Sequence, residues 1–269
     1  MTPKVSIIIL NYRTADLIKY QLQRLFKSPP TVEFEVIVVD NNSEDKIQTI
    51  LQAFPQVIFV AQAENRGYAA GNNAGIGRAQ GKYLLIINPD VIIDGQAIDQ
   101  LVSFMTVNPT VGIAGPRLEY PNGELQESCS RWPTLMLPLY RRTFLANTKL
   151  GKSWLQQYLY RDWDHQSNKD VDWLFGACLI VSKDALLKVG LLDENFFLYL
   201  EDTDWCRRFW LNGYRVTYHN QARVVHYHKR SSAENDFFFG LFSKSSREHI
   251  KSFIKYLRKY RGQPNPHLS

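Results

Sequence analysis

The chain has 269 residues, 45% hydrophobic and 22% charged, which is typical of a globular protein with a sizeable core and fits one large domain with a C-terminal extension. The formal net charge of +6 favours an anionic partner such as a nucleotide, a pyrophosphate or a lipid headgroup, while the 26 acidic residues argue against a nucleic-acid binder. No run approaches the roughly 18 apolar residues of a membrane span.

Short runs of β-branched residues alternate with amphipathic stretches over the first sixty residues. Three runs predict strands, namely Val5–Leu10, Phe34–Val39 and Val57–Val60, and the first two are typical of strands buried in a sheet. Helices are predicted between them, one capped by Thr14 and one from about Asp45 to Phe54. This alternation predicts a parallel sheet with right-handed crossovers.

Polar side chains follow the first two strands directly, Asn11 after one and Asp40 after the other. Each alone is an ordinary turn or cap residue. Together they indicate a ligand edge, because ligands of such sheets bind at the carboxyl ends of the strands. Neither a Gly-x-Gly-x-x-Gly fingerprint nor a Gly-Lys-Ser/Thr loop is present, so side chains at strand ends would hold any nucleotide.

A stretch rich in small residues, Asn65–Gly75, predicts a helix with Gly67, Gly71 and Gly75 on one stripe. Each glycine inside a helix costs roughly 1 kcal/mol relative to alanine. We therefore expect another backbone, a ligand or the sheet itself to approach this stripe closely. Arg66 lies at the mouth of the helix.

A fourth buried strand is predicted at Tyr83–Ile87, and Asn88-Pro89-Asp90 follows it. Proline stops ladder pairing, so Asp90 would be presented at the same edge as Asn11 and Asp40. A divalent cation that holds a diphosphate needs only one or two carboxylates, because phosphate and water oxygens fill the other positions. The alternative for Asp90 is an ordinary turn residue.

Beyond this strand the pattern becomes less regular. A helix from about Gln96 to Val107 and a short strand at Val111–Pro116 are expected. Residues 117–172 show no assignable elements, and loops of that length are often binding loops or lids. One strand is predicted from Val171 to Val181, where Gly176 indicates a bulge or a close backbone approach.

Three carboxylates, Glu201, Asp202 and Asp204, follow the apolar run Phe196–Leu200. Carboxylates are almost never fully buried unless they are paired. Asp204 and Arg208 have the spacing of a helix-surface pair, and Glu201 and Asp202 would suit the N-terminus of that helix. The cluster alone therefore allows a structural or a catalytic explanation.

Two histidines, His226 and His228, would share one face of a strand and are candidate metal ligands. The chain then changes character, with an apolar run at residues 237–242 and a C-terminal helix that has Lys and Arg at its rim. The apolar face of this helix consists of Ile250, Phe253, Ile254 and Leu257. A basic amphipathic helix of this kind lies at a membrane surface or docks onto the domain.

Taken in order, these segments resemble the family 2 glycosyltransferases, in particular the rhamnosyltransferase-like branch of bacterial polysaccharide assembly. The resemblance covers about Val5 to Ser232 and rests on residues 5–12, 38–43, 65–75, 88–90, 115–118, 173–177 and 201–204. It implies a GT-A fold, an α/β architecture with a Rossmann-like nucleotide-binding sheet and an acceptor-side half. This domain would span residues 1–232, and residues 233–269 would form the basic amphipathic helical extension.

The resemblance also implies a nucleotide-sugar donor and a divalent metal, Mg²⁺ or Mn²⁺. Asp40 and Arg66 would hold the nucleoside, with Asn11 lining its pocket. Asn88 and Asp90 match the Asp-x-Asp motif of the family, with Asp90 as the metal ligand. The sequence departs from the motif at Asn88, which removes one negative charge.

On the acceptor side, Asp202 matches the general base of the family, with Glu201 beside it, and Trp173 and Gly176 would border the acceptor site. His226 would be the second metal contact, by comparison with the branch's His-x-x-Gly-x-Ser motif. Lys229 stands where that motif has glycine, and His228 remains a rival for the role.

The resulting hypothesis is an inverting, metal-dependent transferase that moves a sugar, best matched by rhamnosyl from a dTDP- or UDP-type donor, onto a lipid-linked glycan precursor. The three scattered cysteines predict reduced thiols and a cytoplasmic location, with peripheral contact to the inner face of the membrane through the C-terminal helix as one option. Two alternatives are a non-catalytic nucleotide-sugar or membrane-surface binding module and a sugar nucleotidyltransferase. The latter would need a Gly-rich basic loop after the first strand, where the chain has Asn11–Thr14.

Overall fold

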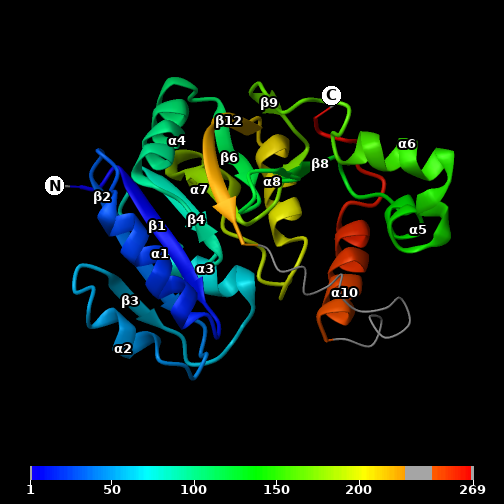
Figure 1. Cartoon of the computed structure of the whole chain (residues 1–269). Coiled ribbons are helices and arrows are strands. Elements are labelled where there is room, and N and C mark those ends of the chain that lie inside the picture. The colour runs from blue at the N-terminus through cyan, green and yellow to red at the C-terminus, as the bar shows by residue number, and fades with distance from the viewer. Residues whose placement is uncertain (1, 228–243, 268–269) are drawn as a thin grey trace.

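A computed structural model describes residues 2–227 and 244–267. Its centre is a mixed sheet with the strand order β3-β2-β1-β4-β11-β6-β12-β5, and helices cover both faces (Figure 1). The main strands are β1 (Val5–Asn11), β2 (Phe34–Asp40), β3 (Ile58–Ala61), β4 (Tyr83–Ile87), β5 (Val91–Ile92), β6 (Val111–Glu119), β11 (Cys178–Ser182) and β12 (Arg215–His226). The short strands are β7 (Leu125–Gln126), which pairs with β6, β9 (Lys169–Asp170), which pairs with β12, and the separate pair β8 (Cys129–Ser130) and β10 (Trp173–Leu174).

The first half of the sheet is parallel, as the sequence predicts. β1 pairs in parallel with β2 and β4, and β2 pairs in parallel with β3. Successive residues of β1 enter different cores, since Ile8 belongs to one apolar cluster and Ile7 and Ile9 to the other. Burial on both faces along β1 and through most of β2 explains why these two strands read as continuous apolar runs, whereas β3, at the edge of the sheet, is only partly buried.

The second half of the sheet is mixed. β11 runs antiparallel to both β4 and β6, whereas β12 runs parallel to β6. Residues 215–226 form one long strand, β12, with a register irregularity between His219 and Arg223. At its end β12 pairs with β5, opposite the residues that follow Asp90.

Helices fill the space on either side. The helices are α1 (Ala15–Lys27), α2 (Ile47–Leu51), α3 (Tyr68–Ile76), α4 (Gly95–Val107), α5 (Met136–Arg142), the 3₁₀ helix η1 (Phe144–Asn147), α6 (Lys149–Tyr158), α7 (Lys183–Val189), α8 (Glu201–Leu211) and α10 (Lys244–Lys259). Apolar residues of α1, α2 and α4 pack on one face, and those of α3, α7, α8 and α10 pack on the other. None of the helices described is both long and apolar enough to cross a bilayer.

Glycines bring α3 close to its neighbours. A Cβ at Gly71 would lie 2.5 Å from the Leu10 side chain, and one at Gly75 would lie 2.6 Å from Ile8. Tight packing against the sheet therefore explains these two positions. Gly67 has a φ of +96°, and a Cβ there would meet the backbone of Phe197, so this loop needs glycine on both counts.

Two expectations about the middle of the chain are wrong. The region 117–172, read as irregular, contains β7–β9 and the helices α5 and α6. The single strand expected from Val171 to Val181 is two strands, β10 and β11, separated by residues 175–177. The break occurs because β10 leaves the main sheet to pair with β8.

The C-terminal helix α10 docks onto the domain. Its Tyr256, and Tyr260 just after its last residue, are buried in the core that also contains Trp205 of α8. Lys259 forms an ion pair with Asp193 at 2.6 Å, and Arg207 donates a hydrogen bond of 2.9 Å to the Pro264 carbonyl. Of the two options that the sequence left open for this helix, docking is therefore confirmed for its inner face.

Candidate active site

The first turn of α8 begins at a strained bend. Tyr199 and Leu200 have φ values of +69° and +65°, a left-handed conformation that costs an ordinary side chain roughly 1–2 kcal/mol. The bend ends the apolar run and starts α8 at Glu201, as its acidic residues predict. Strain of this kind is common where a protein must place a functional group.

Asp202 is held by neutral donors. Its Oδ2 accepts a hydrogen bond of 2.8 Å from the Gly176 amide, and its Oδ1 accepts one of 2.7 Å from the Thr203 amide. A Cβ at Gly176 would lie 3.3 Å from Asp202 Oδ2, so glycine permits this close approach, as the sequence suggests. Burial raises the pKa of Asp202, and these hydrogen bonds oppose the rise.

Glu201 lies beside it in a more enclosed position. The side chain is buried, and its Oε2 has no hydrogen-bond partner in the described parts of the chain. Burial raises the pKa of Glu201 well above its usual range, and the charge of Asp202 raises it further. Ionisation of one carboxyl group therefore disfavours ionisation of the other. Asp202 is the more accessible of the two and is better placed to exchange a proton with a substrate.

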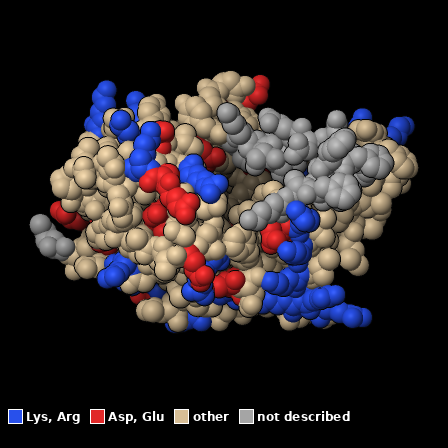
Figure 2. Space-filling model, turned by 90° about the horizontal axis from the view of Figure 1, so that it is seen from below, with Lys and Arg blue, Asp and Glu red and all other residues tan. Residues whose placement is uncertain are grey.

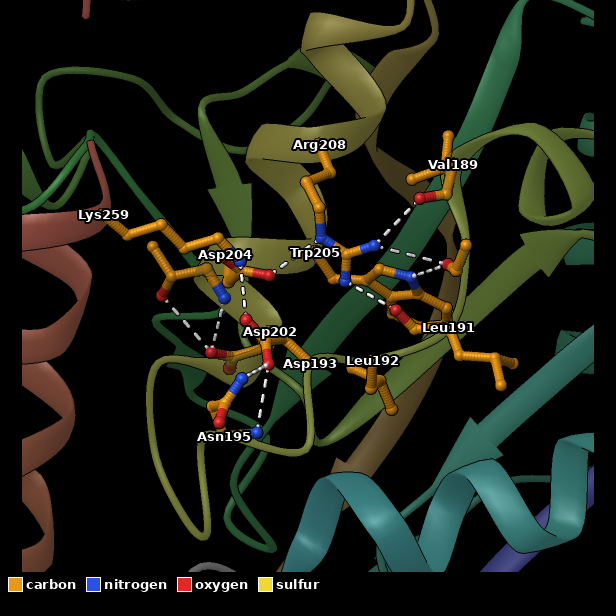
Figure 3. A network of polar contacts seen from close by, with 12 residues as sticks. Val189, Leu191, Leu192, Asp193, Asn195, Asp202, Asp204, Trp205, Arg208 and Lys259 are labelled. Atoms are coloured by element: carbon orange, nitrogen blue, oxygen red, sulfur yellow. Dashed lines mark hydrogen bonds and ion pairs between the residues drawn. The ribbon is translucent and has the colours of Figure 1, made fainter.

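Asp204 belongs to the other side of the same turn. Arg208 Nε lies 2.8 Å from its Oδ2, and Lys259 Nζ and Tyr260 Oη lie 2.6 and 2.7 Å from its Oδ1. Figure 3 shows Arg208 and Lys259 converging on this carboxylate from α8 and α10. Asp204 therefore anchors α10, and the spacing of Asp204 and Arg208 predicted this pair.

Tyr68 of α3 connects the carboxylate turn to the end of β4. Its buried hydroxyl lies 3.0 Å from Asn88 Oδ1 and 2.8 Å from the Gly176 carbonyl, and shares its proton between them. The Asn88 amide also donates to the Ala177 carbonyl at 2.9 Å. The loop that carries Asp90 and the loop that holds Asp202 are therefore joined at one place.

Sequence reasoning missed Tyr68. The available signal was an aromatic residue at the start of a helix otherwise made of small residues. Burial raises the pKa of the Tyr68 phenol, and the nearby charges of Glu201 and Asp202 add to the rise, so the hydroxyl remains a hydrogen-bond donor at neutral pH.

Asp90 and His226 face each other at the end of β12. His226 Nε2 lies 3.4 Å from Asp90 Oδ1, and its Nδ1 lies 2.7 Å from Gln126 Oε1. With this oxygen as the acceptor, Nδ1 carries the proton of the neutral ring and Nε2 turns its lone pair toward the carboxylate. Two electron-rich atoms at this distance fit a shared divalent cation or a proton on the ring.

The donor set therefore fits a hard cation that has few protein ligands. No group of three or more His, Cys, Asp or Glu residues able to hold a metal occurs among the described residues. A cation that holds a diphosphate needs only one or two protein ligands, because diphosphate and water oxygens fill its other positions. His228, the rival of His226, lies outside the described residues, as does the apolar run at 237–242.

The nucleoside-side candidates occupy neighbouring loops. Asn11 is fully buried, and its Nδ2 donates hydrogen bonds of 2.9 Å to Asp40 and 2.7 Å to Ser43. Its side chain therefore shapes the loop that presents the half-buried Asp40. Asn41, which sequence reasoning missed, donates hydrogen bonds of 2.9 Å to Asn65 and 3.1 Å to the Gly67 carbonyl, and so ties this loop to the start of α3.

Arg66 does not point into a buried pocket. Its guanidinium is exposed and forms an ion pair of 2.9 Å with Glu194, which also accepts a hydrogen bond from Asn73 of α3. Nucleoside binding by Arg66 would require this exposed ion pair to open. Such pairs contribute at most about 1 kcal/mol.

The acceptor-side candidates line the bend between β10 and β11. The indole of Trp173 donates a hydrogen bond of 2.7 Å to the Arg131 carbonyl and lies 4.8 Å from the Phe175 ring, centroid to centroid. Gly176 follows and contacts Asp202. The strands β1, β4 and β12 run toward the bottom of Figure 1. Figure 2 shows the molecule from below, so the reader looks at the carboxyl ends of these strands, and the molecular surface is hollowed there.

Comparisons with known proteins show the family of the chain. A family model described as "Glycosyl transferase family 2" matches residues 6–163. An N-acetylglucosaminyl-diphospho-decaprenol L-rhamnosyltransferase from Mycobacterium tuberculosis is 29% identical over an alignment of 216 residues, which covers 75% of this chain and 68% of the relative. Rhamnosyltransferase WbbL from Escherichia coli is 26% identical over an alignment of 268 residues, which covers 96% of this chain and 94% of the relative.

A solved structure shows the same fold. Mannosyltransferase PcManGT from Pyrobaculum calidifontis, in complex with GDP-Man and Mn²⁺, superposes with a TM-score of 0.63 at 18% sequence identity. The superposition covers 99% of this chain and 67% of the other. The GT-A architecture expected from the sequence is thereby confirmed.

Proposed function

Because the chain belongs to glycosyl transferase family 2, we propose that it transfers a sugar, with inversion, from a nucleotide-sugar donor to a lipid-linked glycan precursor. Rhamnose from a dTDP- or UDP-type donor is the proposed sugar, since two relatives that match most of this chain are rhamnosyltransferases. The M. tuberculosis relative is named for an acceptor on a diphospho-decaprenol carrier, which supports the proposed class of acceptor.

One observation carries this proposal. Asp202, Gly176, Tyr68 and Asn88 form a continuous chain of hydrogen bonds, and Asp90 follows Asn88 by two residues. Segments that are far apart in the sequence therefore present a candidate base and a candidate metal ligand to one region. Inverting transfer needs these two groups near the same sugar, one for each side of the reacting carbon.

In the proposed reaction, Asp202 acts as the general base. The acceptor hydroxyl oxygen forms a bond to the anomeric carbon while the bond from that carbon to the donor diphosphate breaks, and the diphosphate leaves with the bonding electrons. Asp202 takes the hydroxyl proton. A carboxylate whose pKa is raised by burial holds that proton better than an exposed one. Until the proton has been transferred, the negative charge of the carboxylate favours an oxocarbenium-like centre, by analogy with the glycosidases.

Asp90 and His226 would hold a divalent cation, Mg²⁺ or Mn²⁺, together with diphosphate oxygens. When bound, such a cation compensates the charge that develops on the departing diphosphate. Gln126 orients the His226 ring for this purpose. Asp40 and Arg66 would hold the nucleoside, within the loop that Asn11 shapes, and Trp173 and Gly176 would border the acceptor.

A thermal-shift panel of nucleotide sugars, run with and without Mn²⁺, tests the proposal. A donor present at 100 times its dissociation constant stabilises the folded chain by about 2.7 kcal/mol. We expect selective stabilisation by one dTDP- or UDP-sugar that needs Mn²⁺ and disappears in Asp90→Ala. Stabilisation independent of metal would contradict the role of Asp90, and no stabilisation by any nucleotide sugar would contradict the proposed donor class.

The two alternatives have less support. A sugar nucleotidyltransferase would not need a base near the acceptor bend, where Asp202 lies. A non-catalytic binding module would not turn over its donor. Sugar transfer by the purified chain excludes the binding module directly.

A further inference from the structure

The positive charge of the chain is unevenly distributed. Residues 128–161 contain six Lys or Arg residues and no Asp or Glu, whereas the whole chain has a net charge of +6. Residues 244–261 carry a further net charge of +6, from seven Lys or Arg residues and one Glu. The remainder of the chain therefore has a net charge of −6, and the positive charge lies in these two segments. The first segment contains α5, η1 and α6. We call residues 135–158, which include these three helices, the α5–α6 arm.

The same arm exposes large apolar side chains. Leu135, Phe144 and Leu150 are 78%, 79% and 76% exposed, and Met136 and Leu139 are also exposed. Exposed apolar residues scattered singly are normal on protein surfaces. Five of them within sixteen residues, in a segment without acidic residues, make this arm both apolar and basic.

These side chains are not needed to hold the arm together. Leu137, Tyr158 and Leu159 form a small core of their own, against which Trp154 of α6 and Phe253 of α10 pack. Trp154 also stacks with Tyr158, with a distance of 5.0 Å between the ring centroids. The inner faces of α5 and α6 are thus occupied by α10, and the exposed leucines and Phe144 lie outside this contact.

The outer edge of α10 continues this surface. Ile250 and Ile254 are exposed there, and so are Arg247, Lys251 and Arg258. Figure 1 shows α10 beside α5 and α6, and Figure 2 shows Lys and Arg gathered at the end of the molecule where α10 lies, next to the hollowed region.

We propose that the α5–α6 arm, together with the outer edge of α10, seats the enzyme on an anionic phospholipid surface. The arm inserts Leu135, Phe144 and Leu150 among the lipid headgroups, and Arg141, Lys149 and Lys152 contact the phosphates. Helices with apolar and basic residues side by side bind bilayers in this way, and each basic residue near an anionic surface contributes about 1 kcal/mol. Exposed apolar side chains flanked by Lys and Arg, with no acidic residue in the arm, suit an anionic headgroup layer.

The arm is also connected to the site. The Arg131 amide donates a hydrogen bond of 2.9 Å to the carbonyl of Tyr158, the last residue of α6. The Arg131 carbonyl in turn accepts from the Trp173 indole at 2.7 Å, and Gly176, three residues further on, holds Asp202. Seating the arm on a bilayer therefore brings the acceptor side of the site toward lipid-linked substrates. This inference rests on the proposed function for the identity of the acceptor, but lipid binding can be measured without it.

Vesicle co-sedimentation of the full chain tests the inference. Wild type should bind vesicles that contain phosphatidylglycerol, bind phosphatidylcholine vesicles much more weakly, and dissociate as salt rises. The variant Leu135→Ser/Phe144→Ser/Leu150→Ser should bind roughly 10-fold or more weakly. The matched control is Val107→Ser/Leu187→Ser, whose wild-type side chains are 73% and 77% exposed outside the arm, and it should bind like wild type.

A second readout separates this inference from the proposed function. The arm variant should keep the donor-induced thermal shift and transfer to a water-soluble acceptor analogue, and lose activity only with acceptor embedded in vesicles. Binding that is equal on neutral and anionic vesicles, or equal in the arm and control variants, overturns the inference. So does a complete lack of vesicle binding, which would leave the surface to a protein partner.

Discussion

Asp202 and Asp204 lie on two sides of the first turn of α8, and their carboxylates have different surroundings. On the side that faces the sheet edge, the donors to Asp202 within residues 2–227 and 244–267 are all neutral: the Gly176 and Thr203 amides and the Thr203 hydroxyl. On the side that faces α10, Asp204 is completely buried and lies within 2.8 Å of both an arginine and a lysine nitrogen.

The difference separates a structural role from a chemical one. A buried carboxylate that is neutralised by cations holds elements together and is unavailable to a substrate. A carboxylate held only by neutral donors keeps its orientation, and burial raises its pKa toward the range in which it can accept a proton. Adjacent acidic residues in a sequence can therefore have separate functions that their spacing alone does not reveal.

The largest effect is expected on the sheet-edge side, from Asp202→Asn. The amide nearly preserves the size of the side chain but cannot take the acceptor proton, so kcat should fall by roughly 10³-fold. The donor-induced thermal shift should stay close to that of wild type. Steady-state kinetics together with donor titration measure both quantities. Turnover within a few fold of wild type would remove Asp202 as the base.

Asp204→Asn should lower the stability of the fold and leave the chemical step unaffected. It leaves Arg208 and Lys259 without their shared anion, and removing one partner of a buried pair costs roughly 3 kcal/mol in the free energy of unfolding. Urea denaturation measures this loss, which should be accompanied by release of α10. Asp162→Asn, at an exposed position, serves as the control and should change stability by less than about 0.5 kcal/mol. A loss of kcat in Asp204→Asn with unchanged stability would contradict the structural role.

The comparison also shows what the sequence could predict. The strands of the first half follow from continuous apolar runs such as Val5–Leu10, and the Asp204–Arg208 pair follows from helical spacing. The glycine inside the strand predicted from Val171 to Val181 indicated a bulge or a close backbone approach at Gly176, but not that Asp202 makes the contact. These features depend on local patterns or on the general rule that parallel strands end at one edge.

Other features depend on tertiary contacts that have no local signature. The left-handed pair Tyr199 and Leu200 turns the chain without a glycine, and Tyr68 joins two loops that are about a hundred residues apart. The helices α5 and α6 were missed because their apolar residues serve two surfaces, a small core around Leu137 and an exposed face around Phe144. Such a distribution blurs the helical period.

A smaller effect on kcat is expected from Tyr68→Phe. This variant tests whether the hydrogen bonds of Tyr68 link Asp202 to the loop that carries Asp90. The change removes the hydroxyl that bonds to Asn88 and to the Gly176 carbonyl, and a hydrogen bond of this kind contributes about 1 kcal/mol. We expect a decrease in kcat of roughly 5-fold, with the unfolding midpoint only slightly lower. Tyr20→Phe, at an exposed position on α1, is the control and should match wild type. A lower unfolding midpoint with unchanged kcat would show that Tyr68 supports the fold alone.

The smallest effect concerns Glu201, which shares the sheet-edge side with Asp202. Burial raises its pKa in the folded chain, so the folded state keeps the proton to a higher pH than the unfolded state, whose value lies near 4.3. Stability is then highest below the unfolded value and falls as pH rises toward the folded one. Glu201→Gln removes this titration, so the variant should be more stable than wild type by about 1 kcal/mol at pH 8 and indistinguishable from it at pH 4. Thermal unfolding across this range measures the difference. A variant that is less stable at pH 8 would mean that the Glu201 carboxylate is compensated in the folded chain, and that the side of the turn facing the sheet edge resembles the side facing α10.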